Sequence, residues 1–319
     1  MLIAAAIITI LLIAGTVIYL QYFGKRRLIV STTTSLYDTG LLDVIEKAFE
    51  ARHPIDVNFI PVGTGVAIQN AKNGDADVTL VHSPKLERSF LEEGYGVCRK
   101  IIAYNFFAIV GPEADSAGIR GLNATEALKR IAAYGESQTQ KTWVSRSDNS
   151  GTHQKEQSLW TASGYNYSEI KIKSWYARAD TGMGGTLLMA EEFSAYTLTD
   201  MGTYLKYSKD DRISLKTLVT EGKEMLNVYS VIAVNHTRHP SVNFEDAITL
   251  IKFLVSEEGQ QLIESHGASD YGQSLFLGAV QPLKQNSSQQ VVQWIQDYSF
   301  FNGSECPPEY RDGHPELYS

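Results

Sequence analysis

Hydroxyl and glycine residues gather in four short stretches of the chain, and each stretch precedes a pattern typical of a helix. These stretches are Thr32–Ser35, Gly63–Gly65, Ser150–Thr152 and Gly182–Gly185. Hydroxyls and free backbone N–H groups at a helix start are hydrogen-bond donors, and the positive end of the helix dipole strengthens their attraction for an anion. A single stretch of this kind is equally typical of an ordinary N-cap with its spare hydroxyls in water. Their recurrence predicts a site for a small oxyanion.

Arg146 is the one cation in these stretches and the loops that contain them, and two interpretations of it stay open. Its guanidinium could make a charge-assisted, bidentate contact with the anion. It could instead pair with Asp148 and brace the loop, and both arrangements can hold at once. Arg146 is therefore a candidate ligand contact, with Asp148 as its candidate brace.

Four other residues near these stretches could contact a ligand, although each has a more common structural role. His82 ends an apolar stretch and His153 lies just inside a helix, where satisfied structural histidines outnumber ligands. Tyr196 could donate its hydroxyl, but a tyrosine at this place in a strand usually serves packing. Met183 is expected to form part of a wall and to take no part in chemistry.

The elements that must position these residues alternate between strand and helix. Apolar stretches at 28–30, 55–59 and 77–81 predict strands, and helical patterns at 41–49 and 66–73 separate them. Alternation of this kind is typical of a parallel sheet, whose ligands bind at the carboxyl ends of the strands. A second unit of the same type follows Gly111, and the apolar stretch Asn227–Asn235 could return the chain to the first.

The sequence therefore predicts an α/β fold of two lobes, each a mixed and mostly parallel sheet flanked by helices. We expect the first lobe to comprise residues 28–110 and 228–319, and the second lobe residues 111–227. Residues 1–27 are expected to form a transmembrane anchor or signal. The 22 residues from Leu2 to Phe23 carry no charge and can span a bilayer, and no clear cleavage site follows. The basic residues Lys25–Arg27 favour a cytoplasmic flank, which conflicts with the outward placement that the function below requires.

Composition excludes several classes of function. The chain has 319 residues, of which 43% are hydrophobic and 20% charged, as in ordinary globular proteins. Its net charge of −8 argues against a nucleic-acid partner. There is no nucleophile elbow, phosphate-binding loop or dinucleotide fingerprint, so we expect no enzyme activity and no cofactor. No Cys/His cluster has metal-ligand spacing, and Cys98 and Cys306 could be either one disulfide or two thiols.

Several motifs, in one order, give the chain a specific resemblance to a known family. It resembles the substrate-binding proteins of tungstate ABC importers, which have the type II periplasmic-binding-protein fold. The resemblance runs from Leu28 to Phe276. It rests on the motifs STTTS at 31–35, DTGLL at 38–42, VGTG at 62–65, GDADVTLVH at 74–82, SRSDNSGTHQKE at 145–156, GMGGTL at 182–187, AYTLTD at 195–200 and GQSLF at 272–276. Met201 and Asn105–Phe106 depart from the family's usual residues, and the first departure removes a charge near the cleft.

The resemblance implies capture of tungstate, or of the similar molybdate, outside the cell and its delivery to a membrane permease. It implies an oxyanion site with no resident metal, closed by the approach of the two lobes. The donors that it implies are Thr33, Thr34, Ser35, Thr64, Ser150, Gly151 and Thr152, with Arg146 as the charged partner. The domain would then lie outside the cell, held to the membrane by the N-terminal segment.

Two alternatives stay open. The first is a receptor for molybdate or phosphate, and Asp148 bears on it. Phosphate carries a proton at neutral pH, so a hydrogen-bond acceptor in the cleft would strengthen its binding. Tungstate is fully ionised and has no proton to donate to such an acceptor. The second is a hydrolase or transferase that uses Ser150 or His153.

Overall fold

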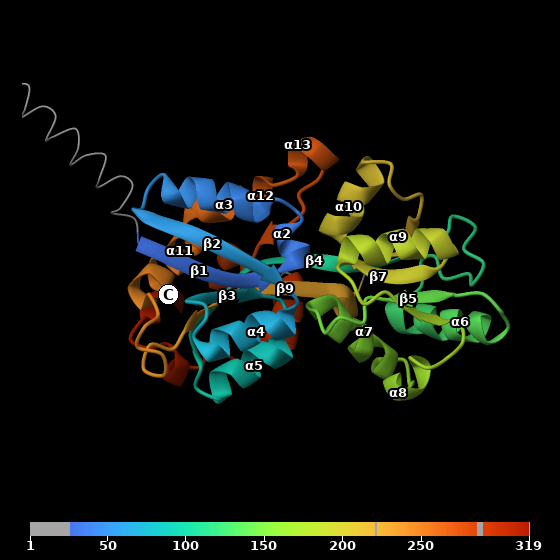
Figure 1. Cartoon of the computed structure of the whole chain (residues 1–319), viewed down its shortest axis with the longest axis horizontal. Coiled ribbons are helices and arrows are strands. Elements are labelled where there is room, and N and C mark those ends of the chain that lie inside the picture. The colour runs from blue at the N-terminus through green and yellow to red at the C-terminus, as the bar shows by residue number, and fades with distance from the viewer. Residues whose placement is uncertain (1–25, 221, 286–289, 319) are drawn as a thin grey trace, which may run out of the picture.

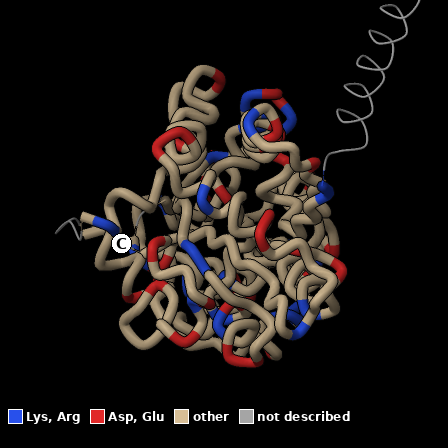
Figure 2. The backbone as a smooth tube through the Cα atoms, turned by 90° about the vertical axis from the view of Figure 1, so that its left-hand side faces the viewer, with Lys and Arg blue, Asp and Glu red and all other residues tan. Residues whose placement is uncertain are grey.

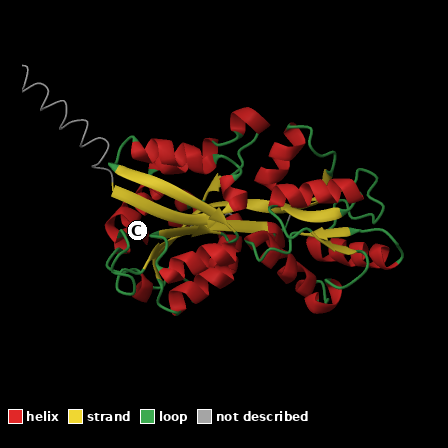
Figure 3. Ribbon diagram, in the orientation of Figure 1, coloured by secondary structure: helices red, strands yellow, loops and turns green. Residues whose placement is uncertain are grey.

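The computed structural model describes residues 26–220, 222–285 and 290–318. Its strands follow one sheet path in the order β2-β1-β3-β9-β4-β7-β5-β6, with β8 and β10 paired to β4 beside that path. Helices flank the strands in both halves of the elongated molecule (Figure 3). We call the half that contains β1, β2 and β3 the first lobe, and the half that contains β5, β6 and β7 the second lobe (Figure 1).

The first lobe begins with the predicted alternation of strands and helices. Its elements are β1 (Arg26–Thr33), α2 (Thr34–Tyr37), α3 (Leu41–Glu50), β2 (Ile55–Val62), α4 (Thr64–Asn73), β3 (Val78–Val81) and α5 (Pro84–Glu92). Helix α3 buries Leu41, Leu42, Ile45 and Phe49, whose spacing places them on one face. Strand β1 pairs in parallel with both β2 and β3, so the carboxyl ends of all three strands lie at one edge.

Two long antiparallel strands connect the lobes. Strand β4 (Gly96–Gly111) pairs with β9 (Leu226–Val234) from Gly96 opposite Val234 to Phe106 opposite Leu226. It then continues into the second lobe and pairs with β7. The sequence predicts only the second part of β4, because Arg99 and Lys100 interrupt the apolar pattern of the first part. Both side chains are nevertheless buried, paired with Glu87 and Glu305 respectively.

The second lobe repeats the parallel arrangement on a smaller scale. Its elements are α6 (Ala124–Glu136), β5 (Trp143–Ser145), α7 (Gly151–Ala162), α8 (Tyr167–Ile170), β6 (Tyr176–Arg178), α9 (Met183–Phe193), β7 (Tyr196–Asp200), α10 (Met201–Lys209) and β8 (Lys216–Val219). Strand β5 pairs in parallel with β6 and β7. The carboxyl ends of these strands, at Ser145, Arg178 and Asp200, therefore share one edge.

The chain returns to the first lobe after β9. The remaining elements are η1 (Lys223–Met225) just before β9, and then α11 (Phe244–Val255), α12 (Glu257–Ser265), α13 (Ala268–Tyr271), β10 (Leu277–Gly278), α14 (Val280–Lys284), α15 (Gln290–Ser299), η2 (Pro308–Tyr310) and η3 (Pro315–Tyr318). The segment beyond Gly278 is polar and its sequence predicts little. In the structure it packs closely, because α15 buries Val292 and Ile295, and Glu305 accepts from the Lys100 ammonium.

Separate hydrophobic cores support the predicted division of the chain. The largest cluster joins buried residues from 28 to 103 with others from 229 to 317. Two further clusters draw only on residues between 107 and 225. The boundaries 28–110 with 228–319, and 111–227, stay a prediction that these clusters favour.

Two other predictions concern the ends of the chain and its thiols. The proposed N-terminal anchor lies almost wholly outside the described residues. Within residues 26–318, apart from the short gaps, no helix has the length and apolar character needed to cross a membrane. Cys98 and Cys306 are both buried, and they are free thiols rather than a disulfide.

Candidate functional site

The first lobe contributes the turn from β1 into α2. Thr33 is the N-cap of α2, and its hydroxyl accepts a hydrogen bond from the Leu36 N–H at 3.4 Å. The Ser35 hydroxyl is buried 3.4 Å from that of Thr33. The sequence suggests a loop across all these hydroxyl residues, whereas the strand continues to Thr33 and the helix starts at Thr34. Their hydroxyls therefore lie at the carboxyl end of a buried strand, where ligands of such sheets bind.

The starts of α4 and α7 come from opposite lobes and touch each other. The Gly151 N–H donates to the Thr64 hydroxyl at 2.9 Å, and both residues are buried. Beside them, a Cβ atom placed on Gly65 would lie 2.5 Å from the amide nitrogen of Asn149. A side chain at position 65 would therefore require the Asn149 side chain to move. The structure thus brings together two of the donor stretches of the sequence, one from each lobe.

Arg146 pairs with Asp148, as one interpretation of its sequence predicts, and it also reaches across to the first lobe. Its Nε donates to Asp148 at 2.7 Å, and its Nη2 donates across the lobes to the Thr34 hydroxyl at 2.8 Å. The other Asp148 oxygen accepts the Ser150 N–H at 3.1 Å. Both Asp148 oxygens are therefore engaged within their own loop, and Arg146 is 2% exposed.

Two polar atoms of this region are buried without a hydrogen-bond partner. They are Arg146 Nη1 and Thr152 Oγ1, on residues at most 2% exposed. A buried donor left unpaired costs about 1–3 kcal/mol, and more if it is charged. Both residues are among the predicted ligand contacts, and they lie in the loop and first helical turn that face the first lobe. Each of these atoms can donate a hydrogen bond to an anion.

The loop before α7 has a strained backbone that His153 holds in place. Ser147 and Asn149 have positive φ angles of 54° and 58°, which residues other than glycine rarely adopt. The Asn149 N–H donates to His153 Nδ1 at 2.9 Å, so the neutral ring carries its proton on Nε2, which contacts the Tyr167 hydroxyl at 2.7 Å. Burial lowers the pKa of His153. The structure therefore gives His153 the structural role.

A buried carboxylate fixes α7 to the strands beneath it. Glu156 accepts hydrogen bonds from Trp143 Nε1 at 2.9 Å, from the Ser145 hydroxyl at 2.7 Å and from the Tyr176 hydroxyl at 2.7 Å. Trp160 Nε1 adds a fourth bond at 3.3 Å. Burial nevertheless raises the pKa of Glu156 to about 7. The first turn of α7, which carries the candidate ligand contacts, is thus tied to β5 and β6.

His82 connects the end of β3 to the strand β9 that links the lobes. Its Nδ1 lies 2.8 Å from Asn227 Oδ1, and the Asn227 amide group donates to Asn105 and Tyr229. Because that amide is already a donor, Asn227 accepts the Nδ1 proton, and the lone pair of His82 Nε2 faces the Ser35 hydroxyl at 3.5 Å. Burial lowers the pKa of His82 to about 4. His82 is therefore neutral near pH 7.

Two of the four secondary candidates lie elsewhere. Tyr196 is the first residue of β7, and its hydroxyl bonds to the Ala117 N–H and to Asp115. The inter-lobe contacts of Arg146 and Gly151 lie beyond the carboxyl end of β5, which pairs in parallel with β7, so Tyr196 is at the wrong end of its strand to reach the ligand. Met183 is fully buried and belongs to a core cluster with Val144 and Leu187. It packs in the second lobe, as a wall residue would.

The sequence missed two residues that shape the site. Asn227, which orients His82, is the polar first position of the apolar stretch 227–235, and a polar residue at the end of a buried strand is a usable signal. Asp200 ends β7, where its buried carboxylate caps α10 by accepting from the Thr203 N–H at 2.8 Å. The sequence pattern does not predict α10, so this N-cap could not be identified from it.

The arrangement suits binding rather than nucleophilic chemistry. The Ser150 hydroxyl accepts the His153 N–H as a helix cap, and the Asn149 N–H occupies the ring nitrogen of His153 that a base would need. The Ser35 hydroxyl faces His82, whose lowered pKa makes it a weak base. Among the described residues, no three His, Cys, Asp or Glu side chains are grouped as metal ligands. What remains is a set of hydroxyl, amide and guanidinium donors from both lobes.

Comparison with known proteins agrees with this geometry. Residues 21–258 match the family described as the PBP superfamily domain. The tungstate-binding protein TupA of Peptoclostridium acidaminophilum is 38% identical over 256 residues, which cover 79% of this chain and 86% of that protein.

Two solved structures are similar over most of their length. The tungstate-binding protein TupA from Desulfovibrio alaskensis G20 has 38% identity and a TM-score of 0.67, with coverage of 80% of this chain and 99% of that one. The tungstate ABC transporter structure from Geobacter sulfurreducens has 43% identity and a TM-score of 0.66, with coverage of 74% and 97%.

Proposed function

The chain belongs to the PBP superfamily, and we propose from this premise that it is the substrate-binding receptor of a tungstate ABC importer. Relatives named for tungstate binding match it at 36–38% identity over 69–79% of its length. Solved structures named for tungstate binding and transport share its fold. Its partners are then tungstate and a membrane permease, and it acts as a transport receptor rather than an enzyme.

We place the ligand where the helix starts of the two lobes meet. Stripping an anion of water is costly unless donors replace its hydration shell, and hydroxyls and helix N–H groups can do so. The side chain of Arg146 adds a charged donor from the second lobe. The residues proposed to contact the oxyanion are Thr33, Thr34, Ser35, Thr64, Arg146, Ser150, Gly151 and Thr152.

One observation carries this placement. Arg146 Nη1 and Thr152 Oγ1 are buried with no hydrogen-bond partner, although both can donate. Buried polar groups in native proteins are almost always paired, and both of these atoms belong to residues that the sequence predicts as ligand contacts. A bound oxyanion would supply the acceptor for both.

The state of Asp148 favours a fully ionised anion over phosphate. Both of its oxygens already accept hydrogen bonds, from Arg146 Nε and the Ser150 N–H. The Asp148 carboxylate therefore braces Arg146 and its own loop, and no contact directs it toward a ligand as an acceptor for the proton that phosphate carries at neutral pH. Tungstate and molybdate carry no such proton, so their binding does not depend on an acceptor in the cleft.

The same proposal assigns roles to the rest of the chain. Residues 28–110 with 228–319 form one lobe and residues 111–227 the other, and their approach buries the ligand. The permease recognises the closed form. Residues 1–27 anchor the receptor in the membrane with its binding domain outside the cell.

Calorimetric titration of the purified full chain with tungstate, molybdate, sulfate and phosphate tests this function. We expect tungstate or molybdate to bind much more tightly than the other two anions. Arg146→Ala removes a charge-assisted donor and should weaken tungstate binding by roughly tenfold or more.

The chain offers a matched control for that variant. Arg178 also pairs with an aspartate two residues later, Asp180 at 2.9 Å, but its side chain is 58% exposed. Arg178→Ala should leave tungstate affinity unchanged. If Arg146→Ala and Arg178→Ala bind tungstate equally well, Arg146 is not part of the site; if no oxyanion binds the unaltered chain, the proposed function is wrong.

A further inference from the structure

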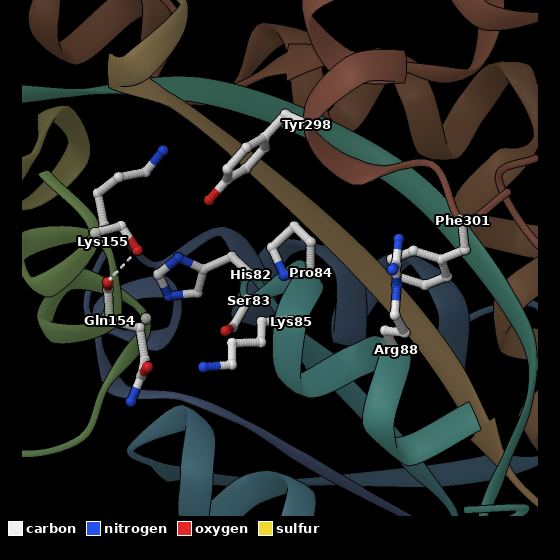
Figure 4. Close-up of a pocket in the computed structure, with 11 residues that line it drawn as sticks. His82, Ser83, Pro84, Lys85, Arg88, Gln154, Lys155, Tyr298 and Phe301 are labelled. Atoms are coloured by element: carbon white, nitrogen blue, oxygen red, sulfur yellow. Dashed lines mark hydrogen bonds between the residues drawn. The ribbon is translucent and has the colours of Figure 1, made fainter. Parts of the chain in front are cut away.

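A second cavity lies between the lobes, beside the proposed tungstate site. Its volume is about 290 Å³, which leaves room for far more than one water molecule. Its walls come from the start of α5 in the first lobe, from α7 in the second lobe and from the C-terminal segment around Tyr298 and Phe301 (Figure 4).

The cavity is lined by cations that have no carboxylate partner. Lys85, Arg88 and Lys155 all face it, and none of the residues that line it is acidic. None of the three forms an ion pair with any residue that the structure describes. The chain as a whole carries a net charge of −8, and Figure 2 shows its basic and acidic positions interspersed. A cavity of unbalanced positive charge is therefore an exception in this molecule.

Lys155 is the most constrained of these cations. It is 6% exposed, its ammonium donates to the Glu224 carbonyl oxygen at 3.0 Å, and it lies 4.0 Å from the ring centre of Tyr298. Burial lowers the pKa of Lys155 to about 7. The charge of Glu224 opposes this lowering of the pKa only in part, and an anion in the cavity would stabilise the charged form further.

The start of α5 adds a further attraction for negative charge. Ser83 is the N-cap of this helix but makes no side-chain capping bond, and Pro84 follows at its first position. Glu87, in the same turn, accepts the Ser83 N–H and is paired with the buried Arg99 at 2.8 Å, so its charge is compensated. The positive end of the α5 dipole thus reaches the cavity without an opposing free carboxylate.

His82 and Gly151 separate this cavity from the tungstate site. A Cβ atom on Gly151 would lie 2.5 Å from His82 Cε1, so backbone and ring are in close contact. His82 Nε2 faces Ser35, a proposed tungstate contact, while the ring also borders the cavity. The other residues proposed to contact tungstate do not line the cavity, which makes the two sites neighbours rather than one site.

We propose that this cavity is a second anion site, which takes a multivalent oxyanion larger than tungstate. The ligand has two or more anionic groups, spaced to reach Lys155 at the inner wall and Lys85 and Arg88 near the rim. Tyr298 supplies a hydroxyl donor between them. Because α5 and α7 belong to different lobes, the site is complete only when the lobes are together.

Pyrophosphate, titrated by calorimetry into the full chain saturated with tungstate, tests this proposal. Binding should persist in the presence of tungstate, because the two sites are separate. The double variant Lys85→Gln/Arg88→Gln should weaken pyrophosphate binding by roughly tenfold and leave tungstate affinity unchanged. The control Lys171→Gln/Arg120→Gln makes the same charge change at exposed residues of the second lobe and should have no effect.

Three outcomes would overturn the proposal: no pyrophosphate binding at all, its complete displacement by tungstate, or equal affinities in the two double variants. A chain that binds pyrophosphate but no tungstate would keep the second site and refute the proposed transport function, so the two failures are distinguishable. Lys155→Met is an independent check, because it removes the inner charge while preserving an apolar stem against Tyr298. It should weaken pyrophosphate binding as well.

Discussion

Thr152 shows how the site trades stability for binding. Its hydroxyl is buried near the start of α7 and has no hydrogen-bond partner among the described residues. A buried hydroxyl without a partner bears its full desolvation cost until water or a ligand satisfies it. The cost of desolvating this hydroxyl is therefore carried by the closed form and offset when an acceptor binds there.

Thr152→Val tests this trade, since valine keeps the shape and removes the hydroxyl. We expect the free energy of unfolding of the ligand-free chain to stay the same or rise by about 1 kcal/mol. Tungstate affinity should fall roughly tenfold, as measured by calorimetry. Thr197→Val is the control, because that buried hydroxyl donates to the Val144 carbonyl at 2.8 Å. Thr197→Val should lose about 1 kcal/mol of stability and keep its affinity for tungstate. A similar loss of stability in Thr152→Val would show that the Thr152 hydroxyl is not unpaired in the folded chain.

Helix α7 is the element on which the site depends most. Its first turn carries Ser150, Gly151 and Thr152, and its second turn carries Glu156, which is held by four donors from β5, β6 and α7 itself. The pKa of Glu156 is raised to about 7 by burial, against an ordinary value of 4.5. Between these two pH values the folded chain holds a proton that the unfolded chain has lost.

This proton gives Glu156 a predictable effect on stability. Unfolding releases the proton between about pH 4.5 and pH 7, so the contribution of Glu156 to stability decreases as the pH rises through that window, by up to about 3 kcal/mol. In Glu156→Gln this loss is absent, so the free energy of unfolding of the variant, relative to the unaltered chain, should rise between pH 5 and pH 8.

Urea unfolding at several pH values measures that difference. The opposite contributions of His82 and His153, whose pKa values are lowered, are common to both proteins and cancel. Glu169→Gln is the control, at an exposed position of α8. Its free energy of unfolding should change with pH in the same way as that of the unaltered chain. If the free energy of unfolding of Glu156→Gln also follows that of the unaltered chain at every pH, Glu156 does not titrate in this range.

Elements with a local signal could be predicted from the sequence. Helix α3 has its apolar residues on one face, and α4 ends at Gly74, whose φ is 79°. The first part of β4 could not be predicted, because the charges of Arg99 and Lys100 are paired by residues that are distant in sequence. In the site, the donor stretches are visible in the sequence, but the contact of Arg146 with Thr34 spans 112 positions and has no local signature.

The lobes of the whole molecule are in direct contact in this structure. Thr34 meets Arg146, and Thr64 meets Gly151, each through a hydrogen bond between the lobes. Gly151 also lies against His82, whose ring is held by Asn227 and stacked 4.9 Å from that of Tyr229. The closed arrangement therefore requires a residue without a side chain at position 151.

Gly151→Ala should keep the lobes apart. Its Cβ would meet a fixed ring, whereas alanine is compatible with the helix itself. In small-angle scattering, we expect tungstate to reduce the radius of gyration of the unaltered chain but not of the variant, whose affinity should fall. Gly182→Ala is the control, since nothing lies within 4 Å of a Cβ there, at the N-cap of α9. Closure of Gly151→Ala with unchanged affinity would refute this account.

The path of the chain through the two lobes also sets an order of events during synthesis. All of the second-lobe core comes from residues 107–225, whereas the first-lobe core needs residues up to 317. Strand β3 pairs with β9, which leaves the ribosome only after the whole second lobe. The half that is translated first is therefore the last to be completed. A chain truncated before β9 would expose β3 as an unpaired edge, ready to associate with other nascent chains.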